Sequence, residues 1–310
     1  MSKPTFIQVA GNTYCWSGKY AIGGYLNPST REAHLIDSGP DFKTAELIEQ
    51  DLTDKGYTLS SILLTHAHLA SAKGASYLKE KHPYLKCYAS PLSATIVNDP
   101  GASAVMNMLD YAPQQQDARA EILVTESIPY HDGVFFIQGV KFSFVTLPGH
   151  FPGMFGILTP DQVLFCADAL FGARTLSKQK LLMFTDPGNA KQSLQKLKSI
   201  RASHYVLYHG GLEKDISSLI QQNLQCIDDM YQQIQDIIKH YQGQTFDIIV
   251  QKLMQRYGID DHEDHYELVR VIARSNINQL LKEGRIRKKV AGGILMYSTE
   301  QPVYDGAPSL

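Results

Sequence analysis

Five side chains that can bind a metal ion stand in loops that follow short apolar runs. In chain order they are His66, His68, His150, Asp168 and His209. Loops that follow buried strands are where a rigid sheet presents functional side chains. Imidazole and carboxylate donors together suit zinc, iron or manganese. The residue types and their positions therefore indicate a metal site, although a single His or Asp in a turn is more often structural or solvated, and only the order of the five residues favours ligands.

The elements that must position these residues alternate between strands and helices. The runs before the five residues predict strands over 61–65, 141–147, 163–166 and 204–208. Apolar positions at helical spacing, with Gly56 as a C-cap, predict a helix over 42–56, and two more helices fit 72–81 and 189–200. This alternation, together with several hairpins, favours an α/β or α+β layered fold with covered sheets.

The pattern changes near residue 213 and becomes almost entirely helical. Helices are predicted over 213–241, 245–256 and 263–283, followed by a hairpin over 285–298 with a glycine turn. Three helices followed by a two-stranded wing resemble a winged-helix module. We expect two domains, 1–212 and 213–310.

The composition fits a globular protein with a sizeable core. Of 310 residues, 44% are hydrophobic and 19% are charged, and the formal net charge of −2 excludes a polycation that binds nucleic acid over its whole surface. No apolar run approaches the roughly 18 residues that span a bilayer. The four cysteines form no CxxC pair, which favours reduced thiols. We expect a cytoplasmic location and no membrane partner.

The order of the motifs resembles the metallo-β-lactamase superfamily, which includes glyoxalase II. The resemblance covers roughly residues 5–212 and implies an α+β fold, a four-layer αββα sandwich. It rests on five segments of the chain, which are Leu35-Ile36-Asp37-Ser38-Gly39, Thr65-His66-Ala67-His68, Pro148-Gly149-His150-Phe151-Pro152-Gly153, Phe165-Cys166-Ala167-Asp168 and His209-Gly210-Gly211.

The histidine loop departs from the family pattern, which reads Thr-His-x-His-x-Asp-His-x-Gly-Gly. Ala70 stands at the Asp position, Ser71 at the third His position and Lys73 at the first Gly position, whereas Gly74 remains. Two further family glycines, those before the last His and before the bridging Asp, are replaced by Tyr208 and Ala167.

The family ligand scheme, carried onto this chain, keeps one metal site and loses the other. By resemblance the first metal is held by His66, His68 and His150, the second by the missing Asp and His together with His209, and Asp168 bridges the two. The first site keeps a full donor set for zinc with an open position, and the second keeps only Asp168 and His209. We expect one zinc ion, with iron or no metal at all as alternatives.

Two residues near the lost site have open roles. Lys73 could place its ammonium near the vacated position, where it would neutralise Asp168 or hold an anionic group of the substrate, or it could point to solvent. Tyr208 could fill the vacated space, donate a proton, or pack as an ordinary tyrosine at a strand end.

A single zinc ion favours hydrolysis of a small activated ester or thioester, because the leaving group is good. Asp168, His209 and Lys73 are the expected catalytic residues: Asp168 would complete or orient the site, and His209 with Lys73 would assist the substrate or proton transfer. Two alternatives remain. His66, His150 and Asp168 match the mononuclear iron site of the family's persulfide dioxygenases, and the protein could also bind a ligand or partner without turnover at a vestigial metal site.

The expected partners are a small-molecule substrate and a second copy of the chain in a homodimer. A basic segment over 270–289 could contact a phosphate backbone, but solvated basic residues explain it as well, and we do not expect a nucleic-acid partner. Loops around 98–130 and 172–188 are expected to determine the substrate.

Overall fold

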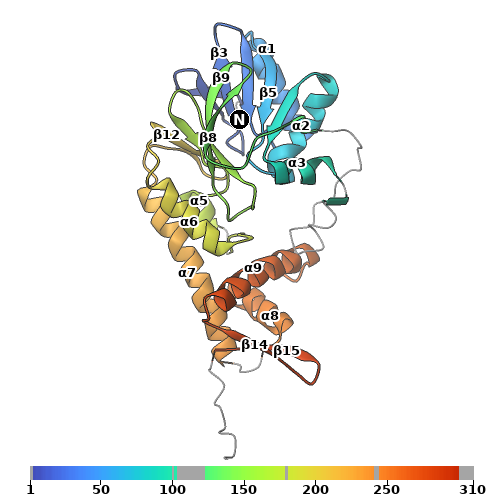
Figure 1. The fold of residues 1–310 in the computed structure, drawn as a ribbon, viewed down its shortest axis with the longest axis vertical. Coiled ribbons are helices and arrows are strands. Elements are labelled where there is room, and N and C mark those ends of the chain that lie inside the picture. The colour runs from blue at the N-terminus through green and yellow to red at the C-terminus, as the bar shows by residue number, and fades with distance from the viewer. Residues whose placement is uncertain (1–2, 100, 103–122, 179–180, 241–243, 300–310) are drawn as a thin grey trace, which may run out of the picture. The chain divides into compact units, whose positions relative to one another are not determined.

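Two β-sheets carry the predicted site loops. The computed structural model describes residues 3–99, 101–102, 123–178, 181–240 and 244–299 (Figure 1). Within these residues, the first sheet has the order β1-β2-β3-β4-β5-β6-β7. Its strands are β1 (Phe6–Ala10), β2 (Thr13–Trp16), β3 (Gly23–Asn27), β4 (Glu32–Ile36), β5 (Thr58–Leu63), β6 (Lys86–Ala89) and β7 (Glu126–Ser127).

The second sheet, again within the described ranges, has the order β13-β12-β11-β10-β9-β8. Its pairs are antiparallel except for β11 and β12, which run parallel. Its strands are β8 (Gly133–Ile137), β9 (Val140–Thr146), β10 (Phe155–Leu158), β11 (Val163–Phe165), β12 (His204–Leu207) and β13 (Gly211–Glu213).

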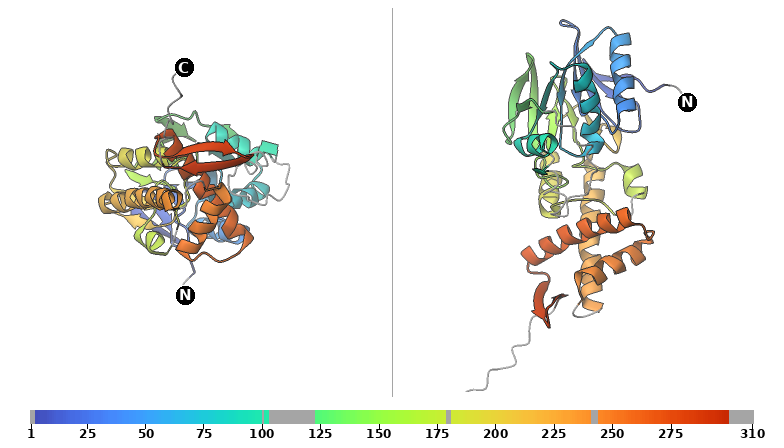
Figure 2. Two further views of the ribbon diagram at one scale, coloured as in Figure 1. Left: turned by 90° about the horizontal axis from the view of Figure 1, so that it is seen from below. Right: turned by 90° about the vertical axis from the view of Figure 1, so that its right-hand side faces the viewer.

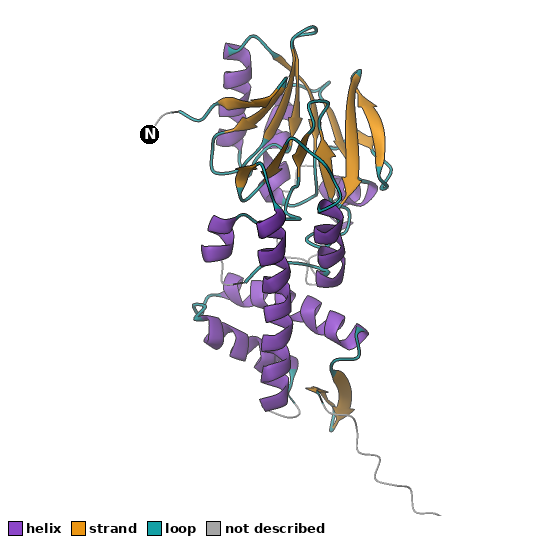
Figure 3. Ribbon diagram, turned by 90° about the vertical axis from the view of Figure 1, so that its left-hand side faces the viewer, coloured by secondary structure: helices purple, strands orange, loops and turns teal. Residues whose placement is uncertain are grey.

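A large apolar core lies between the two sheets, which face each other (Figure 3). Ile36 and Leu63 of the first sheet belong to one buried cluster with Phe142, Phe144 and Phe155 of the second. Burying such side chains stabilises a fold by about 1.5–3 kcal/mol each. The alternation of apolar and polar residues along β9, whose burial alternates over most of its length, is what lets it contribute one face to this core.

Helices cover the sheets. α1 (Phe42–Asp54) and α2 (Leu69–Lys81) pack on the first sheet, where Ile48, Leu52 and Leu78 join a second buried cluster with Leu35 and Ile62; Figure 2 shows these helices on the outer side of the sheet. Further helices among the described residues before residue 200 are α3 (Pro91–Asn98), α5 (Ala173–Lys178) and α6 (Pro187–Leu197). The predicted α+β sandwich is confirmed.

Strand pairing brings the site loops together. Parallel β4 and β5 pair Ile36 with Leu63, so that the segments after both strands start at the same edge. In the second sheet, parallel β11 and β12 do the same for the loops that carry Asp168 and His209. The amide of Phe155, at the start of β10, donates to the carbonyl oxygen of Thr65 at 2.9 Å and joins the two sheets at the site.

The chain divides into two compact units. The first comprises residues 1–180 and 184–224, and the second comprises 181–183 and 225–310. The division falls within α7 (Ser217–His240), and the second unit continues with α8 (Phe246–Tyr257), α9 (Glu263–Lys282) and the antiparallel hairpin of β14 (Arg287–Ala291) and β15 (Ile294–Ser298). Among the described helices, none is both long and apolar enough to cross a membrane.

Candidate metal centre

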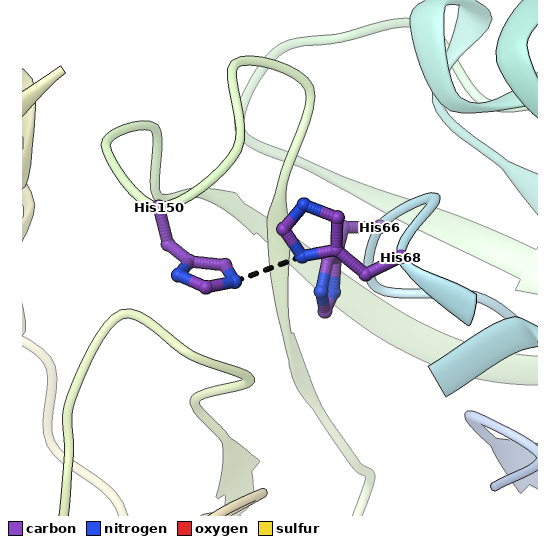
Figure 4. Close-up of side chains that lie close together, drawn as sticks. All are labelled: His66, His68 and His150. Atoms are coloured by element: carbon purple, nitrogen blue, oxygen red, sulfur yellow. Dashed lines mark hydrogen bonds between the residues drawn. The ribbon is translucent and has the colours of Figure 1, made fainter. Parts of the chain in front are cut away.

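Three histidines of the first unit point their ring nitrogens at one another (Figure 4). One ligand nitrogen from each of His66, His68 and His150 lies within 4.8 Å of the other two. The closest pair is His150 Nε2 and His68 Nδ1, at 2.9 Å. His66 and His150 are buried, whereas His68 is partly exposed. The cluster is therefore built into the protein but open on one side.

The carboxylate of Asp168 lies beside this cluster. Its Oδ2 is 3.7 Å from His66 Nε2 and 3.6 Å from His150 Nε2, while its Oδ1 is 3.6 Å from His209 Nε2. The two oxygens thus face different histidines. Asp168 is 2% exposed, so that water does not compensate its charge.

A chain of hydrogen bonds holds His66 from behind. Thr65 donates to Asp37 through both its backbone amide and its hydroxyl, and the same hydroxyl lies 2.9 Å from His66 Nδ1. With Asp37 as a carboxylate, the hydroxyl gives its one proton to Asp37 and accepts from His66 Nδ1. The lone pair of His66 therefore sits on Nε2, which faces the other two histidines. Such partners behind a metal-binding histidine fix its tautomer and orientation.

Glycines let the loops of the centre pack closely. A Cβ on Gly74 would lie 2.2 Å from the carbonyl oxygen of Ser38, so only glycine allows α2 to approach the turn after β4 so closely. Gly149, next to His150, has a φ of +140°, and a Cβ there would lie 2.4 Å from the backbone of Ala190 in α6. These close contacts explain why the family pattern has glycine at both positions.

The electrostatics favour metal-binding forms of the histidines. Burial, followed by repulsion from neighbouring imidazoles, lowers the pKa of His66 and His68 well below the usual value. Both rings are therefore neutral near pH 7, as metal ligands must be. Burial, with a smaller contribution from Asp37, raises the pKa of Asp168 to about 8. An adjacent cation would stabilise its carboxylate form.

The donor set fits a metal ion. His66 Nε2 and Asp168 Oδ1 are buried and have no hydrogen-bond partner among the described residues, which is costly for polar atoms unless an ion or water satisfies them. Two ligands on one tetrahedral zinc lie about 3.4 Å apart, close to the 3.6–3.7 Å that separates Asp168 Oδ2 from His66 and His150. Three imidazoles and a carboxylate suit zinc or iron.

Two buried phenylalanine rings pack against the histidines of the centre. The Phe151 ring lies 5.4 Å from that of His68 and 5.9 Å from that of His66. The Phe171 ring lies 6.0 Å from His150 and stacks on His209 at 6.4 Å. Both phenylalanines are 3% exposed, and they lower the local dielectric, which strengthens charge interactions.

The two further predicted residues differ in their placement. His209 is partly exposed, and its Nε2 faces Oδ1 of Asp168, whereas His66 and His150 face Oδ2. Lys73 lies in the first half of α2, is partly exposed, and forms no hydrogen bond or ion pair with another described residue. The structure brings His209 to the carboxylate but gives Lys73 no contact there.

The replaced positions of the histidine loop offer no charged or imidazole ligand for a metal ion. Ala70 has no ligand atom, and the hydroxyl of Ser71 donates to the carbonyl oxygen of His68 at 2.9 Å. The hydroxyl of Tyr208 donates to the carbonyl oxygen of Ala70. Tyr208 is 2% exposed.

Sequence reasoning assigned no role to Asp37, Thr65, Phe151 or Phe171. Asp37 and Thr65 stand in segments that were recognised as family motifs, but their pairing joins residues 28 positions apart. Parallel pairing of the strands before them was the signal that could have found it. Part of the loops that were expected to determine the substrate, residues 100, 103–122 and 179–180, lies outside the described residues.

Comparison with known proteins gives a family and a fold. Residues 26–222 match the sequence model of the Metallo-beta-lactamase superfamily. Two solved structures share the fold over nearly the whole chain. A metallo-beta-lactamase family protein from Thermus thermophilus has a TM-score of 0.68 and 15% identity over 96% of this chain and 97% of its own. A beta-lactamase domain protein from Burkholderia ambifaria has a TM-score of 0.70 and 14% identity over 95% and 93%.

Curated relatives are similar at low identity. An atrochrysone carboxyl ACP thioesterase from Pseudocercospora fijiensis is 22% identical over 308 residues, which cover 92% of this chain and 79% of the relative. An atrochrysone carboxyl ACP thioesterase from Aspergillus fumigatus is 25% identical over 224 residues, 71% of this chain and 61% of the relative. This chain therefore spans about three fifths of the length of the second relative.

Proposed function

The chain belongs to the metallo-β-lactamase superfamily, and from this premise we propose that it is a hydrolase with one metal ion that cleaves a small activated ester or thioester. The observation that carries the proposal is the convergence of His66, His68 and His150 on one point beside the buried Asp168. Relatives named as thioesterases support a thioester as the substrate class.

A bound zinc ion would be held by the three histidines with Asp168 as the completing carboxylate. It would polarise a carbonyl group and lower the pKa of a water molecule toward about 7. The aromatic side chains Phe151 and Phe171 would limit the water around the reacting carbonyl. The thioester bond suits such a centre because a thiolate leaves readily.

Asp168 and His209 would handle the protons. Oδ1 of Asp168 faces His209 at 3.6 Å, so that the carboxylate can accept a proton on that side while Oδ2 faces the histidine cluster. His209 is partly exposed and could return a proton to the departing thiolate. Burial, followed by the charge of Lys19, lowers the pKa of His209, which favours the neutral ring as an acceptor. Lys73 would hold an anionic group of the substrate.

Metal analysis tests the proposal. Protein purified without added metal should contain close to one zinc per chain, and His150→Ala should lose it together with hydrolysis of a simple acyl thioester. His131→Ala serves as the matched control, because His131 is exposed and stands outside the cluster. Both variants should keep the wild-type circular dichroism spectrum.

Two experimental outcomes would contradict the proposal, and each would favour a different function. Wild-type protein without metal and without uptake on titration with zinc would favour the alternative of a binding protein, which the lost donors at Ala70 and Ser71 also support. Iron instead of zinc, with oxygen consumption and no thioester cleavage, would favour an oxygenase at the same residues.

A further inference from the structure

Tyr208 is a buried tyrosine beside His209. It follows β12 directly and precedes His209. Its hydroxyl donates to the carbonyl oxygen of Ala70. Its ring stacks on Tyr20, with centroids 5.3 Å apart, and meets the His209 ring edge-on at 5.1 Å. Contacts with the start of α2, with Tyr20 and with His209 therefore fix this side chain on three sides.

The Tyr208 side chain lies near the positions that, in the family scheme, would supply the ligands of the second metal ion. Those positions are residues 70, 71 and His209, with Asp168 as the shared carboxylate. The Tyr208 side chain reaches from His209 to the backbone of Ala70 and so spans these positions. The carbonyl of Ser71 accepts from the amide and hydroxyl of Ser38, at 2.8 Å and 3.0 Å.

We propose that the Tyr208 side chain occupies the position of a second metal ion and thereby restricts the centre to one ion. This inference rests on the metal centre of the proposed function. Two differences from the family pattern then act together against a second ion: the loss of the ligands at residues 70 and 71, and the ring of Tyr208.

A neutral side chain is the better occupant once the ligands are gone. Of the acidic ligands that the family scheme places around a second cation, Asp168 is the one that remains, and burying a poorly compensated charge is costly. The phenol brings no charge, and its one polar group is satisfied by the Ala70 carbonyl. It also leaves the carboxylate of Asp168 to a single ion.

The test restores the lost ligands with and without the tyrosine. The variant Ala70→Asp/Ser71→His keeps Tyr208, and we expect it still to bind one zinc per chain after equilibration with excess zinc and removal of free metal. The same variant with Tyr208→Gly added should bind two. Adding Tyr208→Phe instead should leave one, because the ring, not the hydroxyl, fills the space.

Tyr205 provides the matched control. It lies on the strand that leads into Tyr208, and its hydroxyl also donates to a backbone carbonyl, that of Ile200, at 2.9 Å. Tyr205→Gly in the ligand-restored background should loosen the strand without adding a metal. A second ion in this control would show that general loosening is sufficient and would overturn the proposal.

Metal content decides the outcome without reference to activity. The proposal is overturned if the ligand-restored variant binds two ions with Tyr208 present, or if the folded variant with Tyr208→Gly binds no more than its parent. Absence of metal from the wild-type protein counts against the proposed function, whereas the difference between parent and glycine variant decides the role of Tyr208.

Crystals of the wild-type protein give a second measurement that needs no variant. After soaking in excess zinc, the anomalous signal should show an ion among His66, His68 and His150 and no ion between Asp168 and residue 70. An ion at that second position, with the Tyr208 ring displaced, would overturn the proposal even if the glycine variant does not fold.

Discussion

Asp37 accepts two hydrogen bonds from Thr65, one from the backbone amide at 2.9 Å and one from the hydroxyl at 2.9 Å. Both residues are buried, and they stand just after parallel neighbours in the first sheet. The pair determines which nitrogen of His66 carries the proton, since the Thr65 hydroxyl has its own proton committed to Asp37. The carboxylate thus acts on the centre through two intervening groups.

Replacing Thr65 by valine should weaken metal binding although Thr65 is no ligand. Valine has nearly the same shape but cannot accept a proton from His66 Nδ1, so the tautomer and ring orientation are no longer fixed. Loss of such a partner lowers metal affinity by roughly 10–100-fold. Competition with a chelator of known affinity measures the change. Thr58→Val, at an exposed position of the strand that leads into Thr65, should leave the affinity unaltered, and equal affinities in both variants would contradict the argument.

Replacing Asp168 by asparagine should have opposite effects on the metal-free and the metal-loaded protein. Without metal, burial raises the pKa of this carboxyl to about 8, so that folding must protonate it at neutral pH, and a neutral amide that avoids this cost should raise the free energy of unfolding by roughly 1–3 kcal/mol. With zinc present, the lost ligand charge should reduce both the affinity and the gain in thermal stability that bound metal provides. Thermal unfolding with zinc and with a chelator measures both. A change of the same sign in the two states would refute this account.

The sequence alone was sufficient for the layered fold because the pattern is local. The runs before the histidine and aspartate loops became β5, β9, β11 and β12 with shifts of only a few residues. α2 begins at Leu69 instead of the predicted residue 72. His68, whose backbone is extended, serves as the N-cap of the helix. Helical periodicity cannot reveal a start inside a motif that has its own residue requirements.

The centre was harder to predict where it depends on long-range contacts. The motifs named His66, His68, His150, Asp168 and His209, and the structure places these residues side by side. The direction of the Tyr208 side chain had no local signal, since its hydroxyl partner Ala70 is 138 residues away. Lys73 illustrates the reverse case, in which a charged residue at a suggestive sequence position makes no contact with the carboxylate.

Asp51 should give the protein a pH-dependent stability that is unrelated to the metal centre. Although its partial burial acts in the opposite direction, bonds from Lys55, the Phe6 amide and Thr5 hold the pKa of Asp51 below its usual value. A lowered pKa adds stability above the unfolded pKa of about 3.9, and this stability is lost as the pH falls through the folded pKa.

Asp51→Asn should therefore lower the free energy of unfolding by about 1–2 kcal/mol at neutral pH. The difference from wild type should shrink below roughly pH 3.9, where the wild-type carboxyl also becomes protonated. Denaturant unfolding across this pH range measures it. Asp54→Asn, at an exposed position of the same helix, should change little, and a pH-independent difference for Asp51→Asn would rule out the ionic origin.

Ala167 and Ala169 flank Asp168 and should respond in opposite ways to glycine. Both are 3% exposed, but only Ala167 has a positive φ, of 51°. A left-handed backbone costs an alanine roughly 1–2 kcal/mol, whereas glycine elsewhere loses about 0.5–1 kcal/mol through the freedom of the unfolded chain. Ala167→Gly should thus leave stability unchanged or raise it slightly, and Ala169→Gly should reduce it.

The comparison isolates backbone strain because the two sites share burial, side chain and distance from Asp168. The Ala167 carbonyl also accepts from the Tyr208 amide, so the strained turn fixes the carboxylate and the tyrosine together. We expect the two free energies of unfolding to differ by at least roughly 1 kcal/mol in favour of Ala167→Gly. Equal losses at both positions would mean that the turn is relaxed in solution, and the family's glycine before the aspartate would then need a reason other than backbone conformation.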